Sequence, residues 1–478
     1  MGCARQYGVH NNNLENLRRG LYERVLYRVV GGTRTLPLKP SASVIKQELT
    51  NFKTALVGAI PLAHPVTRNQ FVAMYSGRKR TIYEKAAQSL SSRPLQKSDA
   101  YLSTFVKCEK LDFSTKPDPA PRVIQPRSPR YNLEVGRFLK PLEKSVVKGI
   151  ADVWGETTVM KGLNAEQVAQ ELKGKWDKYA DPVAISVDAT RFDQHVNTEI
   201  LEFEHSCYVD MFPTGRRPRL RQLLRMQLRN KGFARAGDGY IRYEVAGRRM
   251  SGDMNTGMGN CLIMCAMMWA LRNKTRPFSL ANNGDDCVII CERADAEAIR
   301  SALPLHFKRY GFLMEVEDTV DVFEAIDFCQ THPVYDGAGW VMVRDPRVCL
   351  DKDTTSVLNI SDSKAAAAWL GAVGECGLSL SGGIPMMQAF YSCLMRHGSK
   401  TNIWAHPHMD SGFKRLAEGM TRKQSPITPE ARASFWRAFD ILPDAQMAFE
   451  DGFDSTSLIL SAGEITTPYI HWKHLWIK

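Results

Sequence analysis

Three aspartates stand at the ends of short apolar segments, and their chemistry is that of a divalent-cation site. Asp188 ends an apolar, alternating segment that opens at residue 183, and Asp285 and Asp286 follow Gly284 between two further apolar segments. Carboxylates about 4 Å apart repel by roughly 4 kcal/mol at an effective dielectric constant of 20. A fold that gathers these side chains therefore needs cations, and carboxylate oxygens favour magnesium, which also binds triphosphates.

The reaction that suits such a site is nucleotidyl transfer. Two magnesium ions would activate a 3′-hydroxyl, contact the α-phosphate and neutralise the pyrophosphate, with manganese able to substitute. A Gly-Asp-Asp sequence alone is weak evidence, since it arises by chance in roughly one chain of this length in ten. Here it occurs with Asp188, a glycine-rich loop at 251–260 and a basic, proline-rich loop at 107–130. The alternative is a purely structural cluster of acids.

Three segments resemble motifs A, B and C of viral RNA-dependent RNA polymerases, and in detail those of carmovirus-like replicases of the Tombusviridae. They are Asp188-Ala-Thr-Arg-Phe-Asp193, Ser251-Gly-Asp-Met-Asn-Thr-Gly-Met-Gly-Asn260 and Gly284-Asp285-Asp286. Further segments resemble motif F (107–130), motif G (75–79) and motif E (328–330). One departure is that the stretch 311–319, in the place of motif D, contains no lysine, so the proton donor to pyrophosphate stays unassigned.

The resemblance implies roles for the acids. Asp188 and Asp285 would bridge both metal ions, Asp286 would assist at the periphery, and the carbonyl of Ala189 or of its neighbour would complete the coordination. Asp193 stands where reverse transcriptases carry an aromatic gate, and an acid there suits a hydrogen bond to a ribose 2′-hydroxyl. Ribonucleotides should therefore be preferred.

The resemblance also implies nucleotide and RNA contacts. Ser251, Thr256 and Asn260 would complete the sugar-sensing network. Arg122 would grip the triphosphate, because a guanidinium binds phosphate bidentately, and Lys107 is a weaker candidate. The residues expected to contact RNA are Arg78, Lys79, Lys110, Arg127, Arg130, Arg221, Arg225, Gly252 and Cys329. Ordinary solvated surface charge is the alternative for each basic residue.

Hydrophobic periodicity predicts the elements that position these residues. A strand over 183–188 has Val183, Ile185 and Val187 on one face, and a hairpin turn at Gly284 needs a positive φ. The other predicted elements are helices over 132–147, 220–229 (with Arg221, Arg225 and Arg229 as a basic stripe), 259–272 and 295–303, where Pro304 should end the helix, and strands over 278–281, 287–291 and 320–330.

The resemblance implies an α+β, right-hand polymerase with an antiparallel palm sheet and an encircled active site. We expect fingers and fingertips over 1–182, palm over 183–204 and 248–334, a fingers insertion over 205–247, and thumb and tail over 335–478. The chain has 478 residues, 44% hydrophobic and 24% charged, so it should fold throughout. Its formal charge of +12 favours polyanionic partners.

The expected partners are single-stranded RNA template, nascent RNA, rNTPs, a viral auxiliary replication protein and host factors. Scattered cysteines without a Cys-x-x-Cys pair indicate a reducing compartment. No apolar run reaches the roughly 20 residues of a membrane span. In the replicases that the chain resembles, this region is made by readthrough of a stop codon after a membrane-targeting segment. We therefore expect Met1 to be an introduced start, and localisation in cytoplasmic, membrane-associated replication complexes.

Two rival functions remain open. A reverse transcriptase would prefer dNTPs, and a catalytically silent RNA-binding replicase subunit would bind RNA without turnover. The resemblance also implies initiation without a primer, and the aromatic tail from Tyr469 to Trp476 offers rings on which a first nucleotide could stack. The alternative for this tail is simple docking on the thumb.

Overall fold

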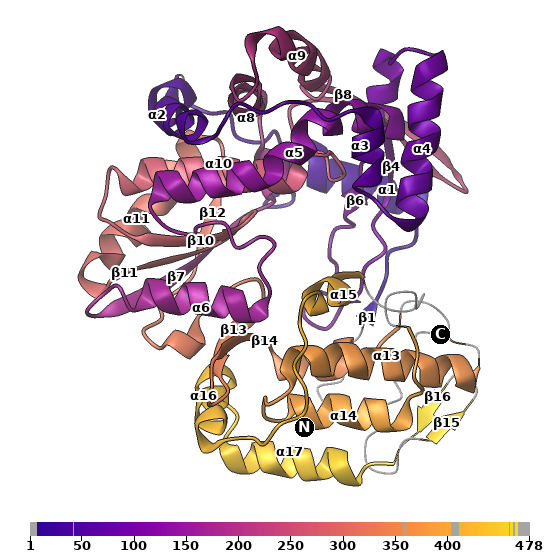
Figure 1. The fold of residues 1–478 in the computed structure, drawn as a ribbon, viewed down its shortest axis with the longest axis vertical. Coiled ribbons are helices and arrows are strands. Elements are labelled where there is room, and N and C mark those ends of the chain that lie inside the picture. Colours follow the sequence, from indigo (N-terminus) through magenta and orange to yellow (C-terminus); the bar gives the residue numbers. More distant parts are fainter. Residues whose placement is uncertain are drawn as a thin grey trace.

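A central antiparallel sheet organises the chain. The structure is a computed structural model that describes residues 7–466 apart from 42, 357–359, 361, 403–410, 458, 462 and 463. Helices and strands both contribute, and Figure 1 shows a large helical body around the central sheet with a second group of helices below it. The expected mixture of helix and sheet is confirmed.

The central sheet has the strand order β10-β11-β7-β12, and every neighbouring pair is antiparallel. Ile185 faces Ile289 across β7 and β11, and Glu315 faces Asp188 across β12 and β7. Gly284 has φ +85° in the turn between β10 and β11, as the sequence predicts. The strands are β7 (Pro182–Ala189), β10 (Ser279–Asn283), β11 (Asp286–Glu292) and β12 (Met314–Val316).

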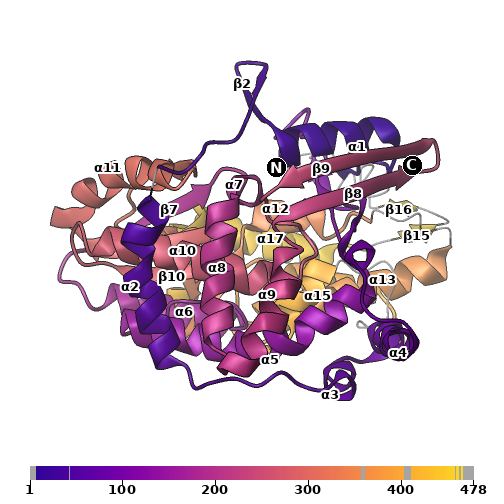
Figure 2. The ribbon, with the colours of Figure 1, turned by 90° about the horizontal axis from the view of Figure 1, so that it is seen from above.

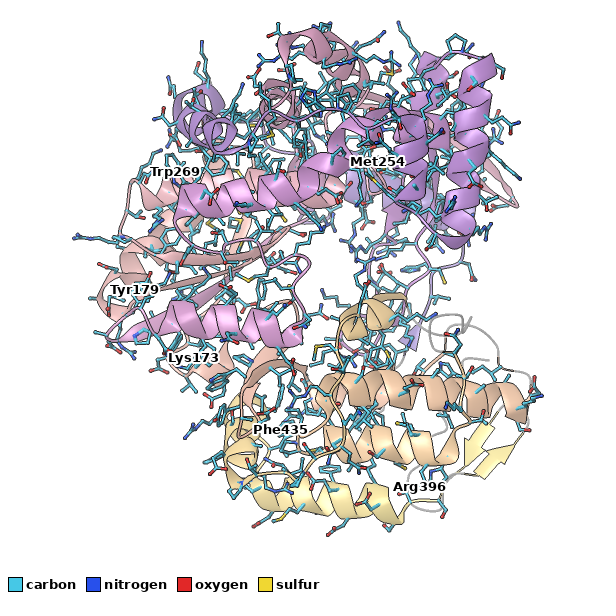
Figure 3. The ribbon with its side chains drawn as sticks, in the orientation of Figure 1. Lys173, Tyr179, Met254, Trp269, Arg396 and Phe435 are labelled. Carbon is cyan, nitrogen blue, oxygen red and sulfur yellow. The ribbon has the colours of Figure 1, made fainter. Side chains whose placement is uncertain are left out.

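Both faces of this sheet are covered, which explains its nearly continuous apolar strands. Ile185 and Ile289 belong to a core shared with α10 (Thr256–Arg272) and α5 (Pro129–Trp154). Side chains of the opposite face, such as Val288, pack with α6 (Ala165–Trp176). Figure 1 shows α10 and α6 on opposite sides of the strands, and Figure 3 labels Trp269 on α10.

A second sheet joins segments that are far apart in the sequence, in the order β6-β4-β8-β9. Its strands are β4 (Leu102–Val106), β6 (Val123–Ile124), β8 (Arg229–Ala236) and β9 (Gly239–Ala246), and α1 (Leu14–Leu21) packs against it. A short pair of strands, β1 (Tyr7–Gly8) and β5 (Leu111–Asp112), ties the N-terminal segment to the proline-rich loop. Helices α2 (Val44–Ala59), α3 (Arg68–Ala73), α4 (Gly77–Ser92) and α9 (Arg217–Arg225) contact α5, and α8 (Thr198–Asp210) contacts α2 and α9.

The C-terminal third has a separate core. Trp369, Tyr391 and Phe435 are buried in it, and Figure 3 labels Phe435 among these helices. Its elements are β13 (Thr331–Tyr335), β14 (Trp340–Arg344), α12 (Pro346–Lys352), α13 (Ser363–Ser381), α14 (Met387–His397), α15 (Ser411–Ala417), α16 (Pro429–Phe439) and α17 (Pro443–Ser455). Among the described helices, we find none with the length and apolar character that crossing a bilayer requires.

The structure corrects two predicted helices. The helix predicted over 220–229 ends at Arg225, and Arg229 opens β8, because the buried amide of Asn230 donates to the carbonyls of Gln227 and Gly247 and turns the chain into the sheet. Helix α11 (Arg293–Arg309) continues through Pro304. The buried apolar face around Pro304, which includes Leu303, outweighs the roughly 3 kcal/mol that an internal proline costs.

The strand predicted over 320–330 is also wrong. This segment contains one 3-10 turn, Phe323–Ala325, and no regular strand. Its apolar side chains Phe323, Ile326 and Phe328 are buried at a spacing that does not alternate. The positive φ angles of Cys329 and Gln330, +55° and +61°, then reverse the chain into β13.

Three buried histidines make the stability of the fold depend on pH. Burial lowers the pKa of His195, His205 and His306 to about 4 each, whereas unfolded histidines titrate near 6.5. The unfolded state therefore binds protons that the folded state does not, and stability falls as pH drops from 6.5 towards 4, by roughly 1.4 kcal/mol per pH unit for each histidine. The raised pKa values of Asp188, Asp285, Asp286 and Glu317 act in the opposite direction. That of Asp285 reaches about 6, so its opposing effect begins at a lower pH than the effect of the three histidines, which starts near 6.5.

We expect the melting temperature to decrease steadily between pH 7 and pH 5, as measured by differential scanning fluorimetry. In His306→Gln the decrease should be shallower, because one of the three proton-linked groups is gone. A melting temperature that stays constant over this interval would contradict the argument.

Candidate active site

The three predicted carboxylates meet at one end of the central sheet. Asp188 lies near the end of β7, directly after Val187, which pairs with Cys287. Asp286 precedes Cys287 at the start of the neighbouring strand β11, and Asp285 lies in the turn before it. The antiparallel register thus brings Asp188 beside the Gly-Asp-Asp turn, as the sequence predicts.

These carboxylates raise one another's pKa. Burial and the charges of Asp193, Asp286 and Asp188 raise the pKa of Asp285 to about 6. Burial and Asp188 raise the pKa of Asp286, and burial and Glu315 raise that of Asp188. The fold therefore concentrates negative charge that it does not neutralise by itself.

The donor set fits divalent cations. Its carboxylates are the oxygen ligands that magnesium and manganese accept, and a cation would relieve the repulsion that raises their pKa values. In the part of the chain that the structure describes, no three His, Cys, Asp or Glu side chains are already drawn together around one metal position. The backbone of Ala189 hydrogen-bonds the Asp188 carboxylate, and the use of its carbonyl as a ligand stays a prediction.

Asp193 is held by two side chains of the glycine-rich loop and the helix after it. Ser251 donates its hydroxyl to Asp193 Oδ2 at 2.9 Å, and Asn260 donates Nδ2 to Asp193 Oδ1 at 3.1 Å. The structure therefore brings these three predicted residues together. Thr256 is not part of this group, since its hydroxyl donates to the carbonyl of Met250 at 3.0 Å.

A fully buried ion pair supports this network from behind. Arg249 and Glu204 have side-chain exposures of 0% each. Arg249 Nε donates to Asn260 Oδ1 at 2.8 Å, which leaves the Asn260 amide nitrogen to donate to Asp193. Glu204 also accepts from Asn255 at 2.7 Å. The sequence does not predict this pair, because an Arg and a Glu 45 residues apart carry no local signal.

Two residues predicted to contact RNA make close contacts within the chain. Gly252 has φ +128°, and a Cβ there would lie 3.1 Å from the backbone of Pro126, so only glycine lets the two loops meet. Cys329 is half-buried, its sulfur accepts from Asn283 at 3.3 Å, and it hydrogen-bonds Asp286. Their RNA contacts stay predictions.

The basic loop over 107–130 carries residues of two kinds. Arg122 and Lys107 both pair with Glu109, at 3.3 and 2.6 Å, and the Arg122 side chain is 56% exposed. Lys110 Nζ donates to the carbonyl of Lys352 at 2.8 Å, so it connects this loop to the C-terminal third. Arg122 thus keeps an accessible guanidinium, as its predicted role requires.

The structure contradicts the prediction that Arg127 and Arg130 contact RNA. The Arg127 side chain has an exposure of 0% and donates to Asp253 Oδ2 at 3.1 Å. Arg130 is 8% exposed and pairs with Asp99 at 3.1 Å. Both guanidiniums form ion pairs within the protein. These pairs hold the basic loop in place against the rest of the fold.

The other predicted RNA contacts lie on the surface. Arg78 and Lys79 are exposed at the start of α4, where Lys79 lies 4.9 Å from the ring centre of Tyr75. Arg221 and Arg225 are exposed on α9. Among the residues that the structure describes, no carboxylate forms an ion pair with any of these four side chains, so RNA contacts stay a prediction for them.

Three cationic residues near the site were not predicted. The charge of Lys116 offsets part of the rise in the pKa of Asp188, so Lys116 lies near that carboxylate. Burial and the charges of Arg191 and Arg122 lower the pKa of Arg24, so these three arginines lie close to one another. Two of these residues could have been found from the sequence, because Lys116 lies in the basic loop and Arg191 lies between Asp188 and Asp193. Arg24 has no signal in the sequence.

The site thus combines carboxylates at the end of an antiparallel sheet with a further acid, Asp193, that Ser251 and Asn260 hold in place. Residues 1–461 match the family model described as viral RNA dependent RNA polymerase. The chain belongs to that family, which confirms the resemblance drawn from its motifs.

Among its relatives are three proteins named RNA-directed RNA polymerase. The chain is 48% identical to that of tobacco necrosis virus strain A, 44% to that of turnip crinkle virus and 42% to that of carnation mottle virus. The matches cover 98%, 96% and 96% of this chain. The chain spans 65%, 59% and 60% of the length of these relatives.

Proposed function

We propose that this chain is an RNA-directed RNA polymerase that copies the genome of a positive-strand RNA virus. The observation that carries the proposal is the meeting of Asp188, Asp285 and Asp286 at the end of the sheet, beside an Asp193 that Ser251 and Asn260 orient. Membership of the family supports the same activity.

A right-hand architecture accommodates the observed cores. The central sheet would be the palm (183–204 and 248–334), and the separate C-terminal core would lie in the thumb (335–478). The pairing of β4 with β8 supports one fingers domain made of 1–182 and the insertion 205–247. One contact supports an encircled site, that of Lys110 in the basic loop with the Lys352 carbonyl.

Two magnesium ions, with manganese able to substitute, would be held by Asp188 and Asp285, with Asp286 and the Ala189 carbonyl assisting. When bound, they would supply activation of the 3′-hydroxyl and stabilisation of charge on the phosphates. The chain's own residues orient the substrates. Arg122 would hold the triphosphate, and Asp193 would accept a hydrogen bond from the 2′-hydroxyl.

Replacement of Asp193 should weaken the choice of ribose. In Asp193→Ala the 2′-hydroxyl loses a charged acceptor worth about 1.5 to 3 kcal/mol, so the preference for rNTPs over dNTPs should fall by about 10- to 100-fold. The ratio of kcat/KM for ATP and dATP measures it. Glu199→Ala, a nearby acid in the first turn of α8, is the control. An unchanged ratio in a folded Asp193→Ala variant would refute the role.

Incorporation of radiolabelled rNTPs on a short single-stranded RNA, with and without magnesium, tests the proposal. Template-length product that needs the metal supports the polymerase. Incorporation of dNTPs exceeding that of rNTPs would favour a reverse transcriptase. Tight, salt-dependent RNA binding without product, from a chain that melts cooperatively, would favour a silent RNA-binding subunit.

The same proposal includes the setting of the reaction. The partners would be single-stranded RNA template, nascent RNA, rNTPs, a viral auxiliary replication protein and host factors. The place would be membrane-associated complexes in the host cytoplasm, reached through an upstream segment or through partners. Initiation without a primer is part of the proposal, and the tail from Tyr469 to Trp476 lies outside the described residues.

A further inference from the structure

The sheet β6-β4-β8-β9 has one packed face and one open face. Val106, Val123 and Ala234 are buried together with Leu17 and Leu21 of α1. Figure 2 shows α1 running along the hairpin of β8 and β9. Successive side chains of a strand point to opposite faces, so the residues between the buried ones point away from α1. They make up the open face of this sheet.

The open face carries aromatic rings that the protein leaves accessible. Phe105 is 42% exposed, Tyr101 directly before β4 is 37% exposed, and Tyr240 on β9 is 60% exposed. Phe233, on β8, is half-buried and its ring lies 6.3 Å from that of Tyr101 with an interplanar angle of 35°. The open face of such a sheet is usually polar, and a cluster of exposed rings marks an interaction site.

Cations are interleaved with these rings. The Arg242 guanidinium lies 5.7 Å from the ring centre of Phe233 and 5.4 Å from that of Tyr240. The registers place Arg242 opposite Phe233 and Arg235 opposite Tyr240. In the part of the chain that the structure describes, Arg235 and Arg242 have no carboxylate within ion-pair distance. Their charge is free for a partner.

The basic stripe expected on one helix ends on this face. Arg229 opens β8 and is exposed, and its side chain lies on the same face as Lys231 and Phe233 because the strand alternates. The acid of this face on β9 is Glu244, which lies 3.9 Å from Lys231. On this face β8 and β9 carry four basic side chains, Arg229, Lys231, Arg235 and Arg242, and one acidic side chain, Glu244. The face therefore has a net positive charge that complements a polyanion.

We propose that this open face, which we call the aromatic sheet face (Tyr101, Phe105, Phe233, Arg235, Tyr240 and Arg242), binds single-stranded RNA. Accessible rings stack only with bases that are already unpaired, and the arginines between them contact the phosphates. A duplex would present its phosphates but bury its bases. The excess of cations sets this surface apart from an apolar protein-docking site. Binding here is independent of the carboxylate site and of polymerase activity.

The test uses the full chain without nucleotides or metal. A 20-nucleotide uridine RNA that contains 4-thiouridine is cross-linked to the wild-type protein, and the modified peptides are mapped. Fluorescence anisotropy then gives the affinity at several salt concentrations. Phe105→Ala/Tyr240→Ala should bind about tenfold more weakly for each stacked base lost. Arg242→Gln should make the salt slope shallower by about 0.7, the value for one phosphate of a single strand.

A matched control is Trp436→Ala, which removes an aromatic ring that is 43% exposed on α16, remote from this sheet in sequence. It should leave affinity unchanged. Cross-links within 101–105 or 233–242 support the proposal even if a variant fails to fold. The proposal is overturned if cross-links avoid both segments. It is also overturned if the folded variants keep wild-type affinity, or if they lose only a concentration-dependent self-association, which would make the face a protein interface.

Discussion

Asp285→Asn should reduce nucleotide incorporation by about 10³-fold or more while leaving the chain at least as stable as the wild type. A bound metal ion contributes several kcal/mol of charge stabilisation in the transition state, and about 4 kcal/mol corresponds to that factor. The amide keeps the shape of the side chain but lacks the charge that holds the ion. Single-turnover extension of a primed RNA in magnesium measures the loss.

The stability half of this expectation follows from the raised pKa of Asp285. Burial and three neighbouring acids raise that pKa to about 6, so at neutral pH the folded state holds a charge that the unfolded state carries more easily. Removing the charge should maintain or raise the melting temperature. A site that is built to bind cations is thus less stable without them, which is a common cost of function.

Asp318→Asn is the matched control for Asp285→Asn. Asp318 is an acid whose side chain is 96% exposed and pairs with Arg300, and its replacement should leave incorporation unchanged. If Asp285→Asn were nearly as active as wild type, the metal-binding role would be wrong. If Asp285→Asn melted well below wild type, its inactivity would not identify the site.

Local patterns predicted the elements of the site well. The alternation before Asp188 and the two apolar segments around Gly284 predicted β7, β10 and β11, because a strand buried on its sheet faces is marked by its own residues. The meeting of Asp193, Ser251 and Asn260 was predicted only through the resemblance to polymerase motifs. The distances that confirm it depend on tertiary packing.

The errors have a shared physical cause. Helix α11 continues through Pro304 because the burial of its apolar neighbours outweighs the cost of a proline inside a helix. The segment 320–330 is apolar because its side chains pack into the core under the central sheet, although it forms no regular strand. Arg127 looked like a channel residue because its partner, Asp253, is 126 residues away. A basic residue in a sequence does not reveal whether a distant carboxylate forms an ion pair with it in the folded protein.

The second large effect is expected from the buried pair behind Asp193. Arg249→Met should lower the free energy of unfolding by about 3 to 5 kcal/mol, because it leaves the Glu204 carboxylate buried without its cation. Urea denaturation measures the change. The double variant Glu204→Leu/Arg249→Met should recover part of the loss, since no unpaired charge is left. Arg80→Met breaks an exposed pair with Glu84 and should cost no more than about 1 kcal/mol.

The same substitution should also change specificity, which distinguishes a positioning residue from a merely structural one. Arg249 Nε donates to Asn260 Oδ1, so Asn260 must present its nitrogen to Asp193. Without Arg249 the amide is free to turn and to place an oxygen against the Asp193 carboxylate, which would displace that acceptor from the ribose. At a temperature where Arg249→Met is folded, its preference for rNTPs over dNTPs should therefore fall towards that of Asp193→Ala. A variant that is destabilised but keeps wild-type discrimination would show that Asp193 is oriented by Ser251 alone.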